Sequence, residues 1–485
     1  NSEESERKGA SMTSRPNVRI ERDSMGEMEV PADALYGAST MRAVLNFPIS
    51  GLGFPRPFIR ALGLIKQSAA KTNMSLGLLD EKIGNAVVAA AQEVIDGTLD
   101  EHFVLDIFQT GSGTSTNTNA NEVIANRASQ ILGGDLGSRL VHPNDHVNMG
   151  QSSNDVIPTS IHLAALLSIK EDLIPGLEFL ADELNKKSDE FWPVVKTGRT
   201  HLQDATPVRL GQEFKGFAGQ AAYSVQRLHR AEEALAEVAL GGTAVGTGVN
   251  THEEFSARTC KTVSEASGVF IKETANHFQA QASLDALVEA SGALKTIAIS
   301  LHKIANDIRF MASGPRAGLG EINLPEVQPG SSIMPGKINP VISESVIQVV
   351  AQVVGNDASV TLAGQGGYFE LNTMMPVAAH NVLQSISLLA ASAHNFAEQC
   401  VKGITATTVG PDMVEKGLML GTALAPAIGY DAAAAIAKEA SARGTTIREM
   451  AKEKTDLSDA ELDELLDLES MTEPGIGAGG AGGGG

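Results

Sequence analysis

The sequence predicts a mainly α-helical protein that contains a bundle of unusually long helices. Ser283 to Ala312 places apolar residues at spacings of three, four and seven without an intervening proline. At 1.5 Å per residue this segment would form a helix roughly 45 Å long. The same periodicity occupies Pro158 to Ser188, with an interruption near Pro175, and also Arg209 to Leu240 and Val341 to Leu362. Helices in globular proteins average about eleven residues, so this set of long segments favours a large bundle.

Composition and charge exclude several classes of protein. With 485 residues and 42% hydrophobic content, the chain is long enough for two or three domains. A formal net charge of −21 argues against a general affinity for nucleic acid or anionic membranes, which both need basic patches. No apolar stretch of about 18 residues is free of polar groups, so we expect no membrane span. Cys260 and Cys400 show no CxxC pairing and no nearby histidine cluster, which predicts a cytoplasmic protein without structural zinc.

Shifts in composition divide the chain into five segments. The two ends cannot build a core, because the first is short and charged and the last is glycine-rich. Near the C-terminus, Ser458 and Glu461 form a capping-box pattern ahead of a short helix. The expected parts are a disordered leader (1–12), a mainly helical N-terminal lobe (13–149), the long-helix bundle (150–407), a small helical domain (408–473) and a flexible tail (474–485).

Four loops of similar chemistry each lie directly before a helical segment. Their serines, threonines and asparagines offer short hydrogen-bond donors, and the helix N-termini add unpaired N–H groups and partial positive charge. Any one of them alone is more often a simple N-cap, and GSGT lacks the lysine of a nucleotide-binding loop. Together they suit a small polycarboxylate. The loops are TGSGTSTNTN from Thr110, GQSSND from Gly150, GRTHLQDATPV from Gly198 and GSSIMPGKINP from Gly330.

The fourth loop is the most informative segment of the chain. Its glycines and prolines exclude a helix or a central strand. The apolar helical run that begins at Val341 follows it at once, so the serines and Lys337 lie just ahead of a helix N-terminus. This arrangement is typical of a segment that holds an anion.

His201 and Glu344 are candidates for acid–base chemistry. A neutral imidazole can accept or donate a proton near pH 7, and a nearby carboxylate can orient it. His201 lies in a polar loop after Arg199 and Thr200, away from any apolar helix face. Glu344 lies in the first turns of an otherwise apolar helix and needs a partner there. The simpler alternatives are a histidine at the surface or in packing, and a glutamate stabilised by the helix dipole.

The ordered motifs resemble those of the fumarase/aspartase superfamily, and within it the class II fumarate hydratases. The resemblance extends from Ile20 to Leu468. It implies a three-domain fold whose central helical bundle forms the core of a tetramer. The motifs that carry it are TGSGTSTNTNANEVIANRA, HPNDHVN, QSSND, GRTHLQDATPVRLGQEF, GGTAVGTG and GSSIMPGKINP.

The resemblance implies reversible hydration of fumarate to L-malate, a step of the tricarboxylic acid cycle, without cofactor or metal. Ser331 would remove the carbon-bound proton, with Lys337 stabilising its negative charge. His201, oriented by Glu344, would handle the proton of the hydroxyl group on the other face, which suits anti addition. The implied substrate-binding residues are Ser112, Gly113, Thr114, Ser152, Ser153, Asn154, Thr200, Asn250, Ser332, Ile338 and Asn339. A second dicarboxylate site would map to Arg139, His142, Pro143, Asn144 and Asp145.

Bundle geometry leads to a hypothesis about assembly. Alternate helices of an up-and-down bundle have their N-termini at opposite ends, so the loops at 152, 201 and 331 are not expected to meet within one chain. Neighbouring chains must then contribute to each site. The resemblance agrees, because the family forms homotetramers whose sites are drawn from three subunits.

Two alternatives remain at this stage. The nearest is an aspartate ammonia-lyase or a related superfamily lyase, which would share the serine base and release an amine. His201 argues against it, because aspartases typically have glutamine at that position. The other is a non-catalytic helical scaffold, which the superfamily includes among lens proteins; the set of Ser331, Lys337, His201 and Glu344 argues against it.

Overall fold

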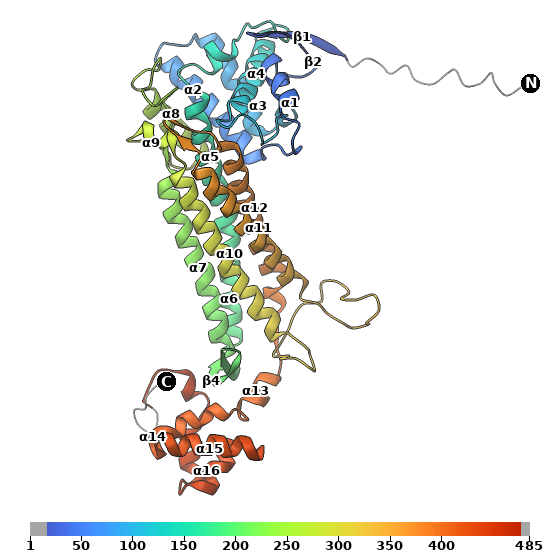
Figure 1. Cartoon of the computed structure of the whole chain (residues 1–485), viewed down its shortest axis with the longest axis vertical. Coiled ribbons are helices and arrows are strands. Elements are labelled where there is room, and N and C mark those ends of the chain that lie inside the picture. The colour runs from blue at the N-terminus through green and yellow to red at the C-terminus, as the bar shows by residue number, and fades with distance from the viewer. Residues whose placement is uncertain (1–16, 477–485) are drawn as a thin grey trace, which may run out of the picture. The chain divides into compact units, whose positions relative to one another are not determined.

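The computed structural model describes residues 17–476, and these residues are mainly helical, as the sequence predicts. Figure 1 shows long helices with short paired strands between them. Within the described range every sheet has two strands. The predicted leader (1–12) lies outside the described residues, as does most of the predicted tail (474–485).

The chain divides into two compact units. The first takes in the described chain up to Glu171, His229–Ala293 and Gly355–Ile386. The second takes in Asp172–Leu228, Leu294–Val354 and the described chain from Ser387. The division into segments at 149 and 407 stays a prediction.

The first unit surrounds an apolar core that includes Ile59, Val87, Val94 and Ile124, all at least 95% buried. Its strands form antiparallel pairs β1–β2 and β8–β9 and the parallel pair β5–β6. Its elements are β1 (Val18–Asp23), β2 (Gly26–Pro31), α1 (Ala38–Asn46), α2 (Arg56–Ser75), α3 (Glu81–Asp96), α4 (Thr114–Ile131), α5 (Ser153–Ser168), β5 (Glu237–Val238), α8 (Phe255–Ser267), β6 (Lys272–Glu273), α9 (His277–Ala282), β8 (Gly367–Tyr368) and β9 (Leu371–Asn372).

Four long helices contribute residues to both units, and they confirm three of the long periodic segments. These helices are α7 (Leu210–Leu235), α10 (Asp285–Met311), α11 (Val341–Gly364) and α12 (Met375–Gln399). The fourth segment, Pro158 to Ser188, is divided between α5 and α6 by a wide turn at Ile169–Leu173, just before Pro175. Proline at the start of α6 (Ile174–Glu190) costs little, because the first N–H groups of a helix have no partner within it.

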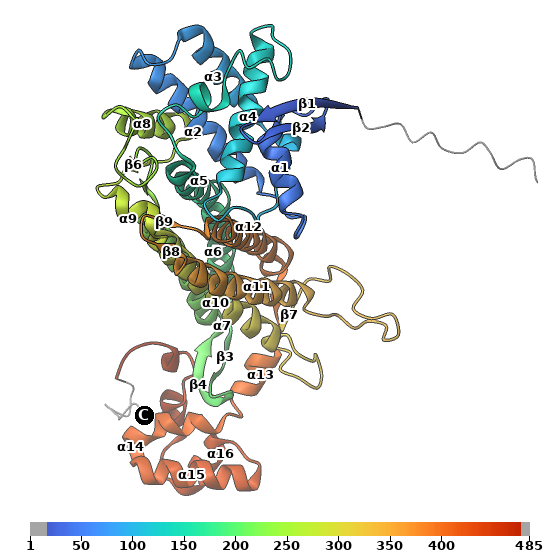
Figure 2. The ribbon, with the colours of Figure 1, turned by 45° about the horizontal axis from the view of Figure 1, so that its top comes forward.

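In the second unit, α6 and parts of α7, α10, α11 and α12 run side by side (Figures 1 and 2). Helices α6 and α12 approach closely at Gly176, where an added Cβ would lie 2.9 Å from the carbonyl oxygen of Ala390. The Ser458 capping box is confirmed, since Ser458 N donates to Glu461 Oε2 (2.8 Å) and Glu461 N to Ser458 Oγ (3.3 Å). The remaining elements are β3 (Val195–Thr200), β4 (Gln203–Arg209), β7 (Ile322–Asn323), β10 (Thr405–Ala406), α13 (Val409–Val414), α14 (Ala425–Ile428), α15 (Tyr430–Arg443), α16 (Ile447–Lys454) and α17 (Asp459–Leu465).

Helix α11 bears on the expectation that the chain has no membrane span. By length and composition it is apolar enough to cross a bilayer, and 39% of its most apolar window is buried within the chain. Polar side chains nevertheless lie in its middle. Asn356 Nδ2 donates to Ser385 Oγ (3.0 Å), and Asp357 Oδ1 accepts from Ser291 Oγ (2.8 Å). Buried polar pairs of this kind are expensive in lipid, so we interpret α11 as a helix that packs against protein.

Candidate functional site

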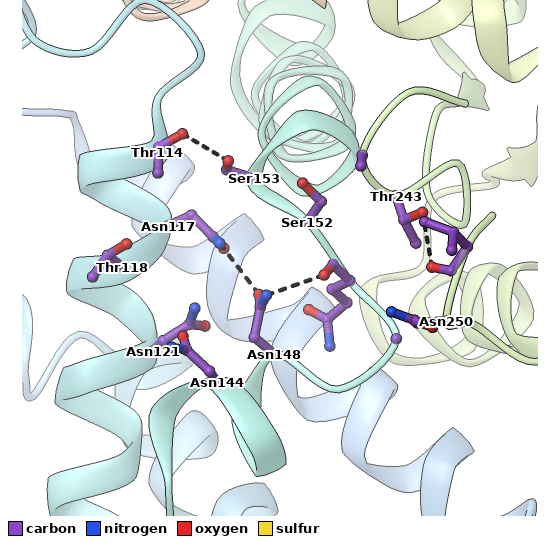
Figure 3. Close-up of a pocket in the computed structure, with 14 residues that line it drawn as sticks. Thr114, Asn117, Thr118, Asn121, Asn144, Asn148, Ser152, Ser153, Thr243 and Asn250 are labelled. Atoms are coloured by element: carbon purple, nitrogen blue, oxygen red, sulfur yellow. Dashed lines mark hydrogen bonds between the residues drawn. The ribbon is translucent and has the colours of Figure 1, made fainter. Parts of the chain in front are cut away.

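A polar cavity of about 400 Å³ lies within the first unit (Figure 3). Its walls come from the first residues of α4 and α5, the loop that precedes α5, and the loop that follows β5. None of the lining side chains carries a charge. They are Thr114, Asn117, Thr118, Asn121, Asn144, Asn148, Gly150, Gln151, Ser152, Ser153, Thr243, Ala244, Val249 and Asn250.

The start of α4 forms one wall. Gly113 precedes this helix with φ 71°, a left-handed conformation that glycine adopts without strain. Thr114 Oγ1 then lies 2.6 Å from Ser112 Oγ and 2.7 Å from Ser153 Oγ, which joins the starts of α4 and α5 through hydroxyl groups. The helix also leaves its first backbone N–H groups at this wall, where they favour an anion.

The start of α5 forms the facing wall. Ser152 caps the helix, since Asn154 N donates to Ser152 Oγ (3.2 Å). Asp155 completes a capping box by accepting from Ser152 N (2.9 Å). Asn154 does not line the cavity, and its Nδ2 donates to Ala244 O (2.8 Å). The two predicted loops at 112 and 152 are therefore brought together as expected.

Asp155 also holds the third wall in place. Its Oδ2 accepts from Gly241 N (3.0 Å) and Thr243 N (2.9 Å), in the loop that carries Asn250. Burial raises the pKa of the Asp155 carboxyl, while the hydrogen bonds from the N–H groups of Ser152, Thr243 and Gly241 oppose the shift. Thr243 has a φ value of 54°, a strained conformation that its hydrogen bonds maintain. Asn250 has a φ value of 63°, which asparagine adopts more readily than most residues. One buried carboxyl thus connects two walls of the cavity.

Sequence reasoning missed several lining residues. Asn117 and Asn121 are at least 96% buried, and the Oδ1 atom of each has no hydrogen-bond partner among the described residues. Buried amide oxygens without partners are uncommon and point to a missing donor such as water or a ligand. The motif TGSGTSTNTNAN could have revealed these two lining residues, because positions 117 and 121 are four residues apart and therefore share one helix face. The other residues missed are Thr118, Asn148, Gly150, Gln151, Thr243, Ala244 and Val249.

His201 lies at the tip of the β3–β4 hairpin in the second unit. His201 and Leu202 have φ values of 55° and 59°, the combination of a two-residue type I′ turn, which usually contains asparagine or glycine. Leu202 is 75% exposed, so packing of its side chain does not explain the strain. Strained turns with ordinary residues are concentrated at functional sites.

A buried ion cluster fixes the base of this hairpin. Lys196 is 99% buried, and its Nζ lies 2.9 Å from both Glu213 Oε1 and Glu321 Oε2. Arg199 NH2, two residues before His201, donates to Glu321 Oε1 (2.8 Å). Burial raises the pKa of Glu213, while Lys196 opposes this shift. The cluster joins the hairpin to the start of α7 and to the segment before β7.

The loop that carries Ser331 also lies in the second unit. Ser331 Oγ accepts from Ile333 N and Met334 N, both at 3.2 Å. Asn339 Nδ2 closes the loop by donating to Gly330 O (2.7 Å). Two N–H donors on one hydroxyl oxygen favour negative charge there.

The structure leaves the predicted catalytic set unassembled within one chain. Glu344 is exposed, and no hydrogen bond or ion pair among residues 17–476 joins it to His201. None of the second-unit candidates lines the cavity of the first unit. Their roles therefore stay predictions; these candidates are Thr200, His201, Ser331, Ser332, Lys337, Ile338, Asn339 and Glu344.

The residues predicted for a second dicarboxylate site separate into two groups. Arg139 and Pro143 line a cavity of about 30 Å³, which is room for about one water molecule. Asn144 lines the large cavity instead. His142 Nδ1 accepts from Asp145 N (3.1 Å), so this histidine caps the following turn. The second site stays a prediction.

Metal and thiol chemistry has little support in the part of the chain that the structure describes. No group of three or more histidine, cysteine or acidic side chains there could hold a metal ion. Cys260 and Cys400 are free and buried, and burial raises the pKa of each thiol to about 12. Both cysteines therefore act as small apolar core residues.

The chain is similar to known proteins along most of its length. A family model described as Lyase matches residues 26–355, and one described as Fumarase C C-terminus matches residues 420–473. The chain is 56% identical over 461 residues to a class II fumarate hydratase of Halobacterium salinarum, covering 95% of this chain and 98% of that protein. It is 50% identical over 469 residues to the human mitochondrial fumarate hydratase, covering 96% and 92%. A recombinant class II fumarase of Schistosoma mansoni has a TM-score of 0.92 at 39% identity, covering 94% of this chain and 99% of that one.

The cavity walls predict a strict requirement for glycine at position 111. A Cβ at Gly111 would lie 1.8 Å from the carbonyl oxygen of Thr373, and Gly111 O accepts from Met375 N (3.0 Å) at the start of α12. Overpacking typically costs about 1–3 kcal/mol, so Gly111→Ala should lower the melting temperature and weaken binding of succinate, measured by calorimetry. Gly216→Ala is the matched control, because a Cβ at Gly216 meets no atom within 4 Å. If the two variants had the same melting temperature and the same affinity for succinate, the requirement for glycine at position 111 would be contradicted.

Proposed function

The chain belongs to the class II fumarate hydratases of the fumarase/aspartase superfamily, and from that premise we propose that it adds water reversibly to fumarate to give L-malate. The observation that carries this proposal is the uncharged cavity bounded by two helix N-termini, Thr114 of α4 and Ser153 of α5. Such a site can hold a small dicarboxylate by hydrogen bonds and helix dipoles.

Binding by neutral donors suits a chain whose net charge is −21. The overall field repels a dianion, so attraction must come from groups close to the carboxylates. The hydroxyl groups of Thr114, Ser152 and Ser153 and the N–H groups behind them supply directed donors on one side. Lys337 and Asn339, in the loop of a neighbouring chain, would supply donors on the other.

The difficult step in the direction of malate dehydration is removal of a weakly acidic carbon-bound proton. The resulting carbanion survives only as a doubly negative aci-carboxylate, which needs donors at the atoms where charge develops. Ser331 would accept the proton in an alkoxide-like form. The two N–H groups that already donate to its oxygen support this role, because they stabilise negative charge on that atom.

The second proton transfer would fall to His201. The imidazole would donate a proton to the departing hydroxyl group from the opposite face of the substrate, directly or through one water molecule. The hydroxyl group would then leave as water. The strained turn and the buried cluster at Arg199 support this role, because they hold the imidazole at a fixed hairpin tip. Glu344 would orient the imidazole from a neighbouring chain.

We place the working enzyme in a homotetramer with shared sites, in the cytoplasm. Helix α11 supports this assembly, since Val354 and Leu362 are 39% and 60% exposed on an otherwise apolar helix. Large exposed apolar helix faces generally mark protein interfaces. The two free, buried cysteines suit a reducing compartment.

The activity itself is the first test. Fumarate formation, followed by its ultraviolet absorbance, should be rapid from L-malate and absent from L-aspartate, because His201 suits loss of a hydroxyl group. Fumarate formation from L-aspartate alone would replace this proposal with an ammonia-lyase.

The Ser331→Ala variant tests the base. It should lower kcat by about 10²- to 10⁴-fold, the usual contribution of a positioned acid or base, while the melting temperature and the oligomeric state stay unchanged. Ser441→Ala, at an exposed position of α15, is the control and should retain full activity. If Ser331→Ala turned over L-malate at the normal rate, another group would have to be the base.

A further inference from the structure

A buried lysine lies directly behind the wall of the cavity. Lys66, on α2, has no exposed surface, although lysine is almost never fully buried without a partner. Its Nζ donates to Asn148 Oδ1 and to Gln151 Oε1, both at 2.9 Å. Asn148 and Gln151 line the cavity, whereas Lys66 does not. The amine therefore touches the wall from behind.

The two amides that Lys66 contacts are fixed at both ends. Asn148 Nδ2 donates to Gln151 O (3.1 Å), and Gln151 Nε2 donates to Val147 O (3.2 Å) and Met149 O (3.1 Å). Asn117 Nδ2 adds a third contact to the wall by donating to Asn148 Oδ1 (3.2 Å). With their nitrogen atoms held by the backbone and their oxygen atoms held by Lys66, these amides have one orientation.

This fixed turn leads directly into the serines of α5. Ser152 follows Gln151, and its N–H donates to Asp155 Oδ1 (2.9 Å). Asp155 is fully buried and is the charged group that acts most strongly on Lys66. Burial lowers the pKa of Lys66 to about 7, although attraction to Asp155 opposes the shift. The amine of Lys66 and the carboxyl of Asp155 thus hold the two ends of the segment from 148 to 155.

We propose that Lys66 is a positioning residue for dicarboxylate binding, which acts through Asn148 and Gln151 to fix the turn that presents Ser152 and Ser153. The inference rests on the proposed function for the identity of the substrate. It assigns no contact between Lys66 and the dicarboxylate. The amine is needed because an apolar side chain of similar length leaves the part-buried Gln151 Oε1 without its donor and leaves Asn148 Oδ1 with Asn117 Nδ2 alone, which loosens the turn.

The test is the Lys66→Met variant of the full-length enzyme. Removing the amine should raise KM for fumarate by about tenfold or more, while kcat changes by less than about threefold, because binding rather than proton transfer is affected. Lys71→Met is the matched control on the same helix, since Lys71 is exposed and its Nζ donates only locally, to Gln67 Oε1 (3.1 Å). A normal KM for Lys66→Met would overturn the proposal.

A double-mutant cycle separates positioning from general loss of stability. If Lys66 acts through Asn148, the combined rise in KM for Lys66→Met with Asn148→Ala should be smaller than the product of the two single effects. If the rises in KM of the two single variants simply multiply in the double variant, Lys66 does not act through Asn148 and the proposal is overturned. Should Lys66→Met not fold, Lys66→Leu replaces it, since leucine also lacks a donor, and a KM equal to that of the wild type would again count against the proposal.

Failure of the proposed function would look different. In that case the wild-type enzyme would not turn over fumarate at all, whatever residue stands at position 66. Succinate binding, measured by calorimetry on the wild type, Lys66→Met and Lys71→Met, needs no turnover. Weaker binding by Lys66→Met alone supports the positioning role, and equal binding by all three proteins overturns it.

Discussion

The architecture of the candidate site depends on one buried carboxylate. Asp155 accepts from Ser152 N in the capping box of α5 and from Gly241 N and Thr243 N in a loop nearly ninety residues later. A desolvated charge is tolerated only with such partners, so its burial constrains the backbone around it. The constraint places two walls of the cavity and the start of α5 in one fixed arrangement. Lys66 holds the other end of the same segment through Asn148 and Gln151.

The two units of the chain carry different parts of the chemistry. The first holds donors without charge, which suits recognition of a dianion by a strongly acidic protein. The second carries His201 on a strained hairpin tip and Ser331 in a loop that already directs two N–H groups at its oxygen. In the proposed enzyme, recognition and proton transfer come from separate segments, which meet through neighbouring chains.

Local patterns predicted much of this molecule. The period of α10 and the cap at Ser458 follow from short-range physics, whereas the contact between the polar loops at 112 and 152 forms through tertiary packing. The inner wall was not predictable, because Asn117 and Asn148 come together only through tertiary packing. The burial of Lys66 was also not predictable, since a lysine on an amphipathic helix ordinarily faces solvent. Glu344 is exposed in the single chain, so its pairing with His201 stays a prediction.

The central claim is that the cavity of one chain works with Ser331 of another, and subunit complementation tests it most directly. One inactive variant carries Thr114→Ala with Ser153→Ala in the cavity, and the other carries Ser331→Ala. Co-expressed in one cell and purified as mixed assemblies, they should regain fumarate hydration, because some sites then combine an intact cavity with an intact serine. Mixed assemblies that stay as inactive as either parent would contradict the account, since each site would then lie within a single chain.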